Sequence, residues 1–360
     1  MRWFQSSCVA MGLCFALLAK GSGSVLPENF ALLSEDVQAL LLEYAFFSDQ
    51  VNQRWGEQAS FASQKAYVKY LDDYLSRATV DFDRGVLIVE TLATSEPKKQ
   101  LRSAIVTALL TPDDPAAVDL YSARKISANG KPFLLGQVLD RDGQSIAYEW
   151  RAQKFADFLI EHQLQVSETA QGLRYWVSIE MVANHTQVAA QGIRGWVTQA
   201  SNRFNLPESL ILAIIETESG FNPFAVSHAN AYGLMQIIPS TAGADVFQKV
   251  LRKSGQPSRD YLFNAQNNIT VGSAYLTILR DNYLSGIQNP TSQLYCIISA
   301  YNSGAGNVFK TFHHNRKQAI RRINSLSVDE VLWRLRKHQP SHEARRYVEK
   351  VLAFQKKYDT

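Results

Sequence analysis

The chain has 360 residues, and 46% of them are hydrophobic, which is enough to build two domains with separate cores. Its 37 basic and 33 acidic residues give a formal net charge of +4. An excess so small and so scattered argues against a nucleic-acid-binding protein.

The first 24 residues are predicted to form a secretory signal peptide. Arg2 precedes an apolar run of twelve residues from Cys8 to Ala19, and small residues follow at 21–24. This run is shorter than the roughly 20 residues that span a bilayer. We therefore expect export to the cell envelope, into the periplasm, with an uncleaved anchor as the alternative.

Residues 25–184 mix helical and strand patterns. Ser34 is a natural cap for an amphipathic helix that ends at Gly56. Because no regular β-α-β rhythm follows, the patterns predict an α+β domain built on an antiparallel sheet. The expected elements are helices at 34–55, 64–75, 97–111 and 152–163, hairpins at 79–92 and 133–148, and a strand at 173–181.

After about residue 188 the strand pattern disappears. Residues 185–360 are therefore predicted to form a second, mostly α-helical domain. Its expected helices cover 188–204, 207–219, 239–250, 267–284, 290–301, 316–323, 327–337 and 342–357.

Glu218 is the candidate catalytic residue of this second domain. It lies at the end of a strongly apolar helix that Gly220 and Pro223 terminate. Apolar surroundings and the negative end of the helix dipole both disfavour the carboxylate, so we expect a raised pKa, as a general acid requires. A lone glutamate near a helix end is more often a solvated surface residue. Glu216 is a competitor, because side chains two positions apart point to roughly opposite sides of a helix.

Four segments of the second domain together resemble the lysozyme-like domain of lytic transglycosylases, in the goose-type lysozyme superfamily. Order and spacing match over roughly residues 190–358. The upstream half is similar to the amino-terminal domain of a membrane-bound lytic transglycosylase, through YVKY at 67–70, residues 113–122 and PFLLGQV at 132–138. The four segments are ESGFNP at 218–223, YGLMQIIP at 232–239, AYNSGAG at 300–306 and RRYV at 345–348.

This resemblance implies a set of site residues. It selects Glu218 over Glu216 as the catalytic residue, and it implies an enzyme without metal or cofactor whose substrate is the peptidoglycan glycan strand. Without the resemblance, Met235 could equally be core filler and Tyr301 a packed aromatic residue. The residues expected to orient the carboxyl group, line the cleft or contact the sugar are Ser219, Met235, Gln236, Tyr301, Asn302 and Tyr347.

No second carboxylate stands out near Glu218. Asp245 lies in another predicted helix, and Glu208 lies at the opposite end of the helix that carries Glu218. Ordinary glycosidases use two carboxylates, but an N-acetylated sugar can supply its own nucleophile. The resemblance implies that Glu218 protonates the bridge between N-acetylmuramic acid and N-acetylglucosamine. Glu218 then takes a proton from the C6 hydroxyl, which closes a 1,6-anhydro ring. A lysozyme-type hydrolase and a non-catalytic glycan-binding protein are the alternatives.

The cysteines and the basic residues predict little further chemistry. After cleavage of the signal only Cys296 remains, and its apolar neighbours predict a buried small hydrophobe. Neither Cys8 nor Cys14 has the sequence context for the lipid anchor that the resemblance implies. The histidines lack acidic partners at metal-ligand spacing, so no metal is expected. Basic residues of the last helix are interpreted as a solvated face, and partners in the envelope are expected through the amino-terminal domain.

Overall fold

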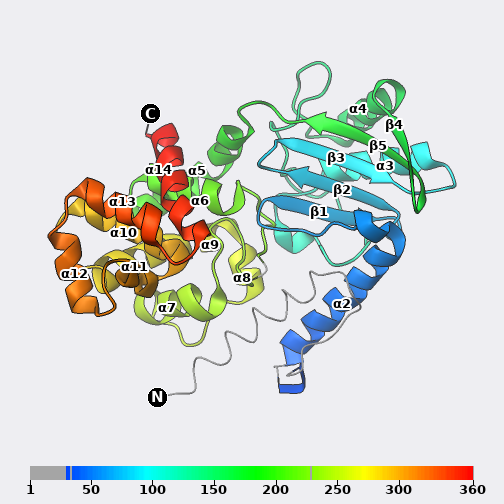
Figure 1. The fold of residues 1–360 in the computed structure, drawn as a ribbon. Coiled ribbons are helices and arrows are strands. Elements are labelled where there is room, and N and C mark those ends of the chain that lie inside the picture. Colours follow the sequence, from blue (N-terminus) through cyan, green and yellow to red (C-terminus); the bar gives the residue numbers. More distant parts are fainter. Residues whose placement is uncertain (1–29, 33–34, 228, 360) are drawn as a thin grey trace. The chain divides into compact units, whose positions relative to one another are not determined.

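The computed structural model describes residues 30–32, 35–227 and 229–359, which fall into two compact units (Figure 1). The first unit combines Met1–Gln191 with Gly220–Gln236, and the second combines Gly192–Ser219 with Ile237–Thr360. The predicted signal peptide, residues 1–24, lies outside the described residues. Within the described ranges, none of the helices has the length and apolarity needed to cross a bilayer.

An antiparallel sheet forms the centre of the first unit, and it confirms the predicted α+β class. In the described residues the sheet has five strands in the order β1-β2-β3-β5-β4, and each strand is antiparallel to its neighbour (Figure 1). The predicted hairpin between β2 and β3 and the predicted strand near 173–181 are both present. The strands are β1 (Ala66–Leu71), β2 (Ser76–Asp81), β3 (Val86–Thr91), β4 (Gln165–Thr169) and β5 (Gly172–Glu180).

Helices cover both faces of this sheet. Helix α3 (Pro97–Leu109) packs on β2 and β3, and α4 (Glu149–His162) packs on α3. Helix α2 (Glu35–Trp55) contributes Phe47, Val51 and Trp55 to a cluster on the other side of β1. The side chains of β1 therefore alternate between two buried layers, because successive residues of a strand point to opposite faces.

Two predictions in this unit are wrong. Residues 64–75 form strand β1 and a turn instead of a helix. Because both faces of β1 are buried, its sequence lacks the polar–apolar alternation that usually indicates a strand. The predicted hairpin at 133–148 is replaced by a turn at Asp140–Gly143 and two isolated bridges, Leu135 with Val138 and Leu139 with Ser145.

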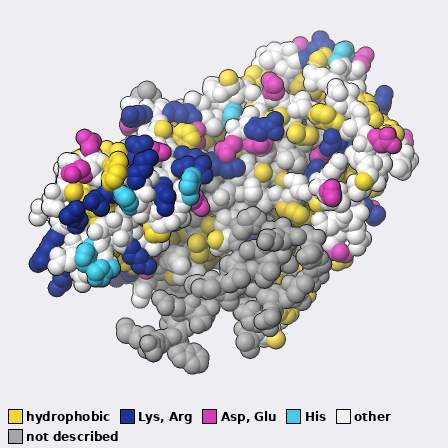
Figure 2. Space-filling model, viewed as in Figure 1, with side chains coloured by type: hydrophobic (Ala, Val, Ile, Leu, Met, Phe, Trp, Pro, Cys, Tyr) yellow, Lys and Arg dark blue, Asp and Glu magenta, His cyan; other side chains and the backbone are white. Residues whose placement is uncertain are grey.

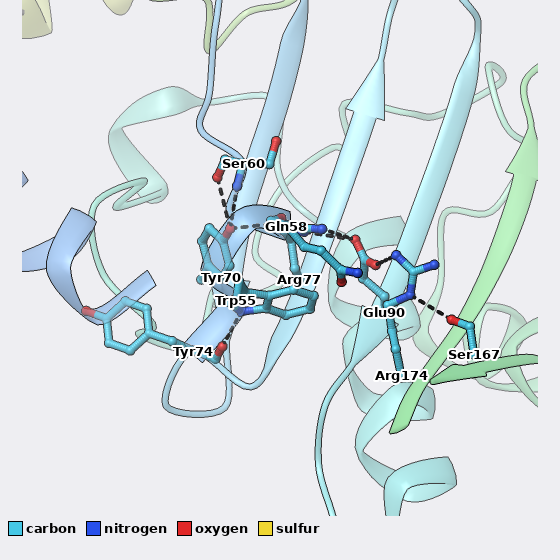
Figure 3. A network of polar contacts seen from close by, with 9 residues as sticks. All are labelled: Trp55, Gln58, Ser60, Tyr70, Tyr74, Arg77, Glu90, Ser167 and Arg174. Atoms are coloured by element: carbon cyan, nitrogen blue, oxygen red, sulfur yellow. Dashed lines mark hydrogen bonds and ion pairs between the residues drawn. The ribbon is translucent and has the colours of Figure 1, made fainter. Parts of the chain in front are cut away.

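A buried ion-pair network fastens the end of α2 to the sheet (Figure 3). The Arg77 guanidinium donates two hydrogen bonds to Glu90 Oε1, at 2.9 and 2.6 Å, and one to the Gln58 carbonyl at 2.6 Å. It also lies over the Trp55 ring, 4.1 Å from the ring centroid. Arg174 donates to the other oxygen of Glu90 at 3.3 Å. One buried carboxylate thus joins β2, β3 and β5.

The described residues of the second unit form helices joined by loops and contain no strand, as predicted (Figure 1). Helix α6 packs closely against α14, and α10 packs against α11, α13 and α14. Two short helices, α8 and α11, were not predicted. The helices are α5 (His185–Phe204), α6 (Glu208–Ser219), α7 (Ala244–Val246), α8 (Arg259–Phe263), α9 (Ala265–Ile278), α10 (Pro290–Ser303), α11 (Ala305–Phe312), α12 (Arg316–Asn324), α13 (Val328–His338) and α14 (His342–Tyr358), with α5 beginning in the first unit.

Two glycines end helices beside the predicted site segments. Gly220 follows α6 with a φ of 60°, and Gly304 separates α10 from α11 with a φ of 80°. Side chains with a Cβ rarely adopt these left-handed values, so glycine is favoured at both positions. Helix α6 therefore ends directly after Glu218 and Ser219, as the sequence predicted.

Candidate active site

Helix α6 carries Glu218 out of the core of the second unit. Residues 209–216 of this helix are all buried, whereas Glu218 itself is half-buried. The helix is held by apolar packing along most of its length, and its last turn reaches the edge of the packed region. A carboxyl group at this position is held rigidly and still has access to a ligand.

Tyr347 of α14 contacts this carboxyl group directly. Its hydroxyl donates a hydrogen bond of 2.6 Å to Glu218 Oε1. Burial, followed by the charge of Glu218, raises the pKa of Tyr347 well above its usual value. The phenol therefore keeps its proton at every physiological pH and remains a hydrogen-bond donor.

A second tyrosine, Tyr301 of α10, lies near the same carboxylate. Burial raises the pKa of Tyr301 well above its usual value, and the charge of Glu218 raises it further. The Tyr301 ring packs against the Tyr275 ring with 5.8 Å between centroids. Next to it, Asn302 Nδ2 donates to Glu343 Oε1 at 3.0 Å, which connects α10 with the first turn of α14.

Glu216 has different partners from Glu218. Its Oε1 pairs with Lys357 Nζ at 2.8 Å, and its Oε2 accepts a hydrogen bond of 2.6 Å from the Tyr358 hydroxyl. Both carboxylates of α6 thus contact α14, near opposite ends of that helix. The side chain of Glu216 is buried and neutralised by a cation, an arrangement that suits a structural role.

The remaining predicted residues are held by local contacts. The Ser219 hydroxyl is buried and donates to the Ile215 carbonyl at 3.0 Å. Met235 and Gln236 belong to the first unit, where the side chain of Met235 is fully buried. Gln236 Nε2 donates to the carbonyls of Ala225 and Gly233, at 3.2 and 2.9 Å. Gln236 also has a φ of 48°, an uncommon backbone conformation for a residue with a Cβ.

Sequence reasoning did not identify the groove beside Tyr275. It has a volume of about 520 Å³ and runs between residues 240–248, Tyr275, Tyr283 and the start of α11. Asp245 lines it, but its two oxygens are engaged by Lys249 Nζ at 2.8 Å and by the Tyr283 hydroxyl at 2.9 Å. No signal in the sequence linked these residues, because they lie up to 38 positions apart. The described residues contain no cluster of three or more acidic, His or Cys side chains able to hold a metal.

Comparisons with known proteins identify the class of this helical unit. Residues 196–324 match the family described as the transglycosylase SLT domain. Among solved structures, the chain is similar to the lytic transglycosylase Slt of Pseudomonas aeruginosa, an inactive mutant, with a TM-score of 0.37 and 27% sequence identity. It is also similar to the 70 kDa soluble lytic transglycosylase of Escherichia coli, with a TM-score of 0.35 and 26% sequence identity. Each likeness covers 46% of this chain and 23% or 24% of the solved chain.

The particular family follows from the rest of the chain. Residues 33–192 match the amino-terminal domain of membrane-bound lytic murein transglycosylase C. Proteins of that name from Yersinia pestis (strain Pestoides F) and Yersinia pseudotuberculosis (serotype O:1b, strain IP 31758) are each 43% identical over 344 residues. Those residues are 95% of this chain and 96% of each relative. The chain therefore belongs to the family of membrane-bound lytic murein transglycosylase C, and it is a lytic transglycosylase.

Proposed function

We propose that the chain cleaves the β-1,4 bond between N-acetylmuramic acid and N-acetylglucosamine in peptidoglycan, without water, and leaves 1,6-anhydro ends. The observation that carries this proposal is the hydrogen bond between Tyr347 and Glu218 at the end of a buried helix. It gives the half-buried carboxyl group a fixed orientation, which a group acting first as acid and then as base requires.

Tyr347 determines which oxygen of Glu218 carries the proton. Because the phenol remains a donor, Oε1 accepts its hydrogen and the transferable proton resides on Oε2. In the first step Oε2 protonates the glycosidic oxygen. The carboxylate that forms is stabilised by the same Tyr347 hydrogen bond. In the second step the carboxylate removes the proton of the C6 hydroxyl as that oxygen attacks C1, and the starting state is restored.

Asp245 is already engaged and does not offer a second catalytic carboxylate. It is the acidic residue that lines the groove beside Tyr275, and Lys249 and Tyr283 already occupy its oxygens. We propose that the acetamido oxygen of the substrate stabilises the developing cation as an oxazolinium-like species. The aromatic rings of Tyr275 and Tyr301 would limit the access of water, which favours ring closure over hydrolysis.

Other residues and features complete the proposal. As the family motifs imply, we assign substrate contacts to Gln236, Tyr301 and Asn302, and we assign Ser219 and Met235, whose side chains are fully buried, to the support of the site. We also propose a signal peptide at 1–24, an amino-terminal domain at 25–184 and a catalytic domain at 185–360. The expected location is the periplasmic face of the envelope. The amino-terminal domain is proposed to position the catalytic domain on its polymer or to bind another envelope protein.

Digestion of purified sacculi tests the reaction. Mass spectrometry of the soluble products should find anhydro-muramic ends with the wild-type chain and no release with Glu218→Gln. Glu216→Gln is the matched control, because it alters a carboxylate two positions away, and the folded variant should release the same products. Reducing ends as the main product would instead indicate a hydrolase, and release by Glu218→Gln would remove the assigned acid.

A further inference from the structure

The small net charge of the chain conceals a strong asymmetry. The last 60 residues contain thirteen basic and five acidic residues, a net charge of +8. The preceding 300 residues contain 24 basic and 28 acidic residues, a net charge of −4. Figure 2 shows Lys and Arg side chains gathered over the part of the second unit where α12, α13 and α14 lie. The positive charge is thus concentrated on neighbouring helices.

Three of the five acidic residues of this stretch, all exposed, form contacts with neighbouring side chains or backbone of the same unit. Glu330 caps α13 through a capping box with Ser327, and Glu343 accepts a hydrogen bond from Asn302. Glu349 of α14 pairs with Arg336 of α13. These contacts leave an excess of basic side chains at the surface.

The ion pair between Arg336 of α13 and Glu349 of α14 shows which sides of the two helices lie next to each other. Residues three or four positions from a helical residue share its side of the helix, so Trp333 lies on the Arg336 side and Arg346 on the Glu349 side. We define the basic face as Trp333, Arg336, Lys337, Arg346 and Lys350. Apart from Arg336, none of its cations forms an ion pair with another described residue.

Trp333 indicates what kind of partner the basic face would bind. Its side chain is 52% exposed although it is one of the largest apolar groups of the chain, and its ring packs edge-on against the His338 ring, with 4.9 Å between the ring centroids. An exposed tryptophan among arginines and lysines suits the headgroup region of a lipid bilayer, where indole rings partition and guanidinium groups bind phosphate.

We propose that the basic face of α13 and α14 docks on a membrane surface that contains anionic phospholipids. The cations contact the headgroup phosphates, and Trp333 enters the interface between them. The face lies on the catalytic unit itself, so the docking would hold this unit at the bilayer independently of any attachment through the amino terminus.

Vesicle flotation of the full chain tests this proposal. The probe is vesicles of phosphatidylcholine with 30% phosphatidylglycerol, compared with pure phosphatidylcholine. The face variant is Lys337→Gln, Arg346→Gln and Lys350→Gln, which keeps the Arg336–Glu349 pair. The charge-matched control is Lys98→Gln, Lys125→Gln and Lys131→Gln, three exposed lysines of the first unit.

The face variant should bind the anionic vesicles at least tenfold more weakly than the wild type, and the control should stay within twofold. Trp333→Ala should weaken binding severalfold, and 0.5 M salt should abolish the difference between vesicle types. Circular dichroism must show that all variants are folded. Equal binding of the wild type to both vesicle types would overturn the proposal. So would a face variant that loses sacculus binding but keeps vesicle binding, because the face would then serve the glycan polymer.

Discussion

The two units hold their buried carboxylates in contrasting ways. In the first unit, Glu90 is 4% exposed and accepts hydrogen bonds from two guanidinium groups, those of Arg77 and Arg174. In the second unit, the hydrogen bond to Glu218 comes from a phenol, and the carboxyl group is only half-buried. Glu216, two positions earlier on α6, resembles Glu90 because Lys357 neutralises it.

This difference in hydrogen-bond donors distinguishes a carboxylate that stabilises the fold from one that is suited to proton transfer. Two guanidinium groups engage both oxygens of Glu90, so this carboxylate serves the structure of the sheet. A neutral donor orients the group and still allows it to gain and lose a proton. We therefore expect changes at Glu218 to reduce activity and changes in the Arg77–Glu90 network to reduce stability.

The largest expected effect is on activity. Glu218→Gln removes the transferable proton and keeps the shape of the side chain, so turnover of sacculi should fall by about a thousandfold or more. Binding to sacculi should change little. Release of soluble fragments and cosedimentation with sacculi measure the two quantities. A variant that loses binding and turnover in parallel would break the assignment of a purely chemical role.

Arg77→Met tests the structural side of the comparison. It leaves Glu90 buried with a weaker set of partners and removes the hydrogen bond to the Gln58 carbonyl. The free energy of unfolding of the first unit should fall by about 3–5 kcal/mol, as for other broken buried ion pairs. Urea denaturation measures it. Lys99→Met, which removes an exposed ion pair with Glu96, is the control and should change stability by less than about 1 kcal/mol.

Tyr347→Phe should have an intermediate effect. It removes one hydrogen bond to Glu218 and keeps the ring, so kcat should fall by roughly 10- to 100-fold, in line with a hydrogen bond to a charged group. Below pH 10 the wild-type tyrosine stays protonated, since its pKa is raised. The ratio of the two kcat values should therefore be constant from pH 5 to 9. A ratio that changes with pH in this range would mean that Tyr347 itself transfers a proton.

The sequence indicated elements best where one face is buried and the other exposed. Helix α2 and the hairpin of β2 and β3 have such patterns, and their predicted positions are confirmed. Strand β1 was mistaken for a helix because Val68 and Tyr70 enter one apolar layer and Tyr67 enters the other. Helix α11 was missed because it begins beside two glycines that indicate a turn.

The candidate site could be predicted only in part. Glu218 was predicted as the catalytic residue from local signals, namely an apolar helix and the glycine that ends it. The partner of Glu218 on α14 is 129 residues away, and Lys357 is 141 residues from Glu216. Spacing along the chain carries no information about contacts at such separations. Resemblance to known motifs selected Glu218 over Glu216, and the packing of α6 on α14 supplies a physical reason for that choice.

The smallest predicted effect is the pH dependence of stability that Lys69 causes. Lys69 is a buried charge held by backbone carbonyls. Its ammonium group donates to the carbonyls of Asp119 and Ser122, both at 2.6 Å, and burial lowers its pKa to about 8. Between pH 8 and 10 the unfolded chain keeps a proton that the folded chain releases, so stability should rise with pH, by about 1 kcal/mol per pH unit. Above pH 10 buried tyrosines such as Tyr44, whose pKa is raised to about 12, reverse the trend. Urea denaturation at pH 7.5 and 9.5 should show this rise in the wild type and in Lys154→Met, and Lys69→Met should abolish it. A rise that persists in Lys69→Met would assign the titration to another group.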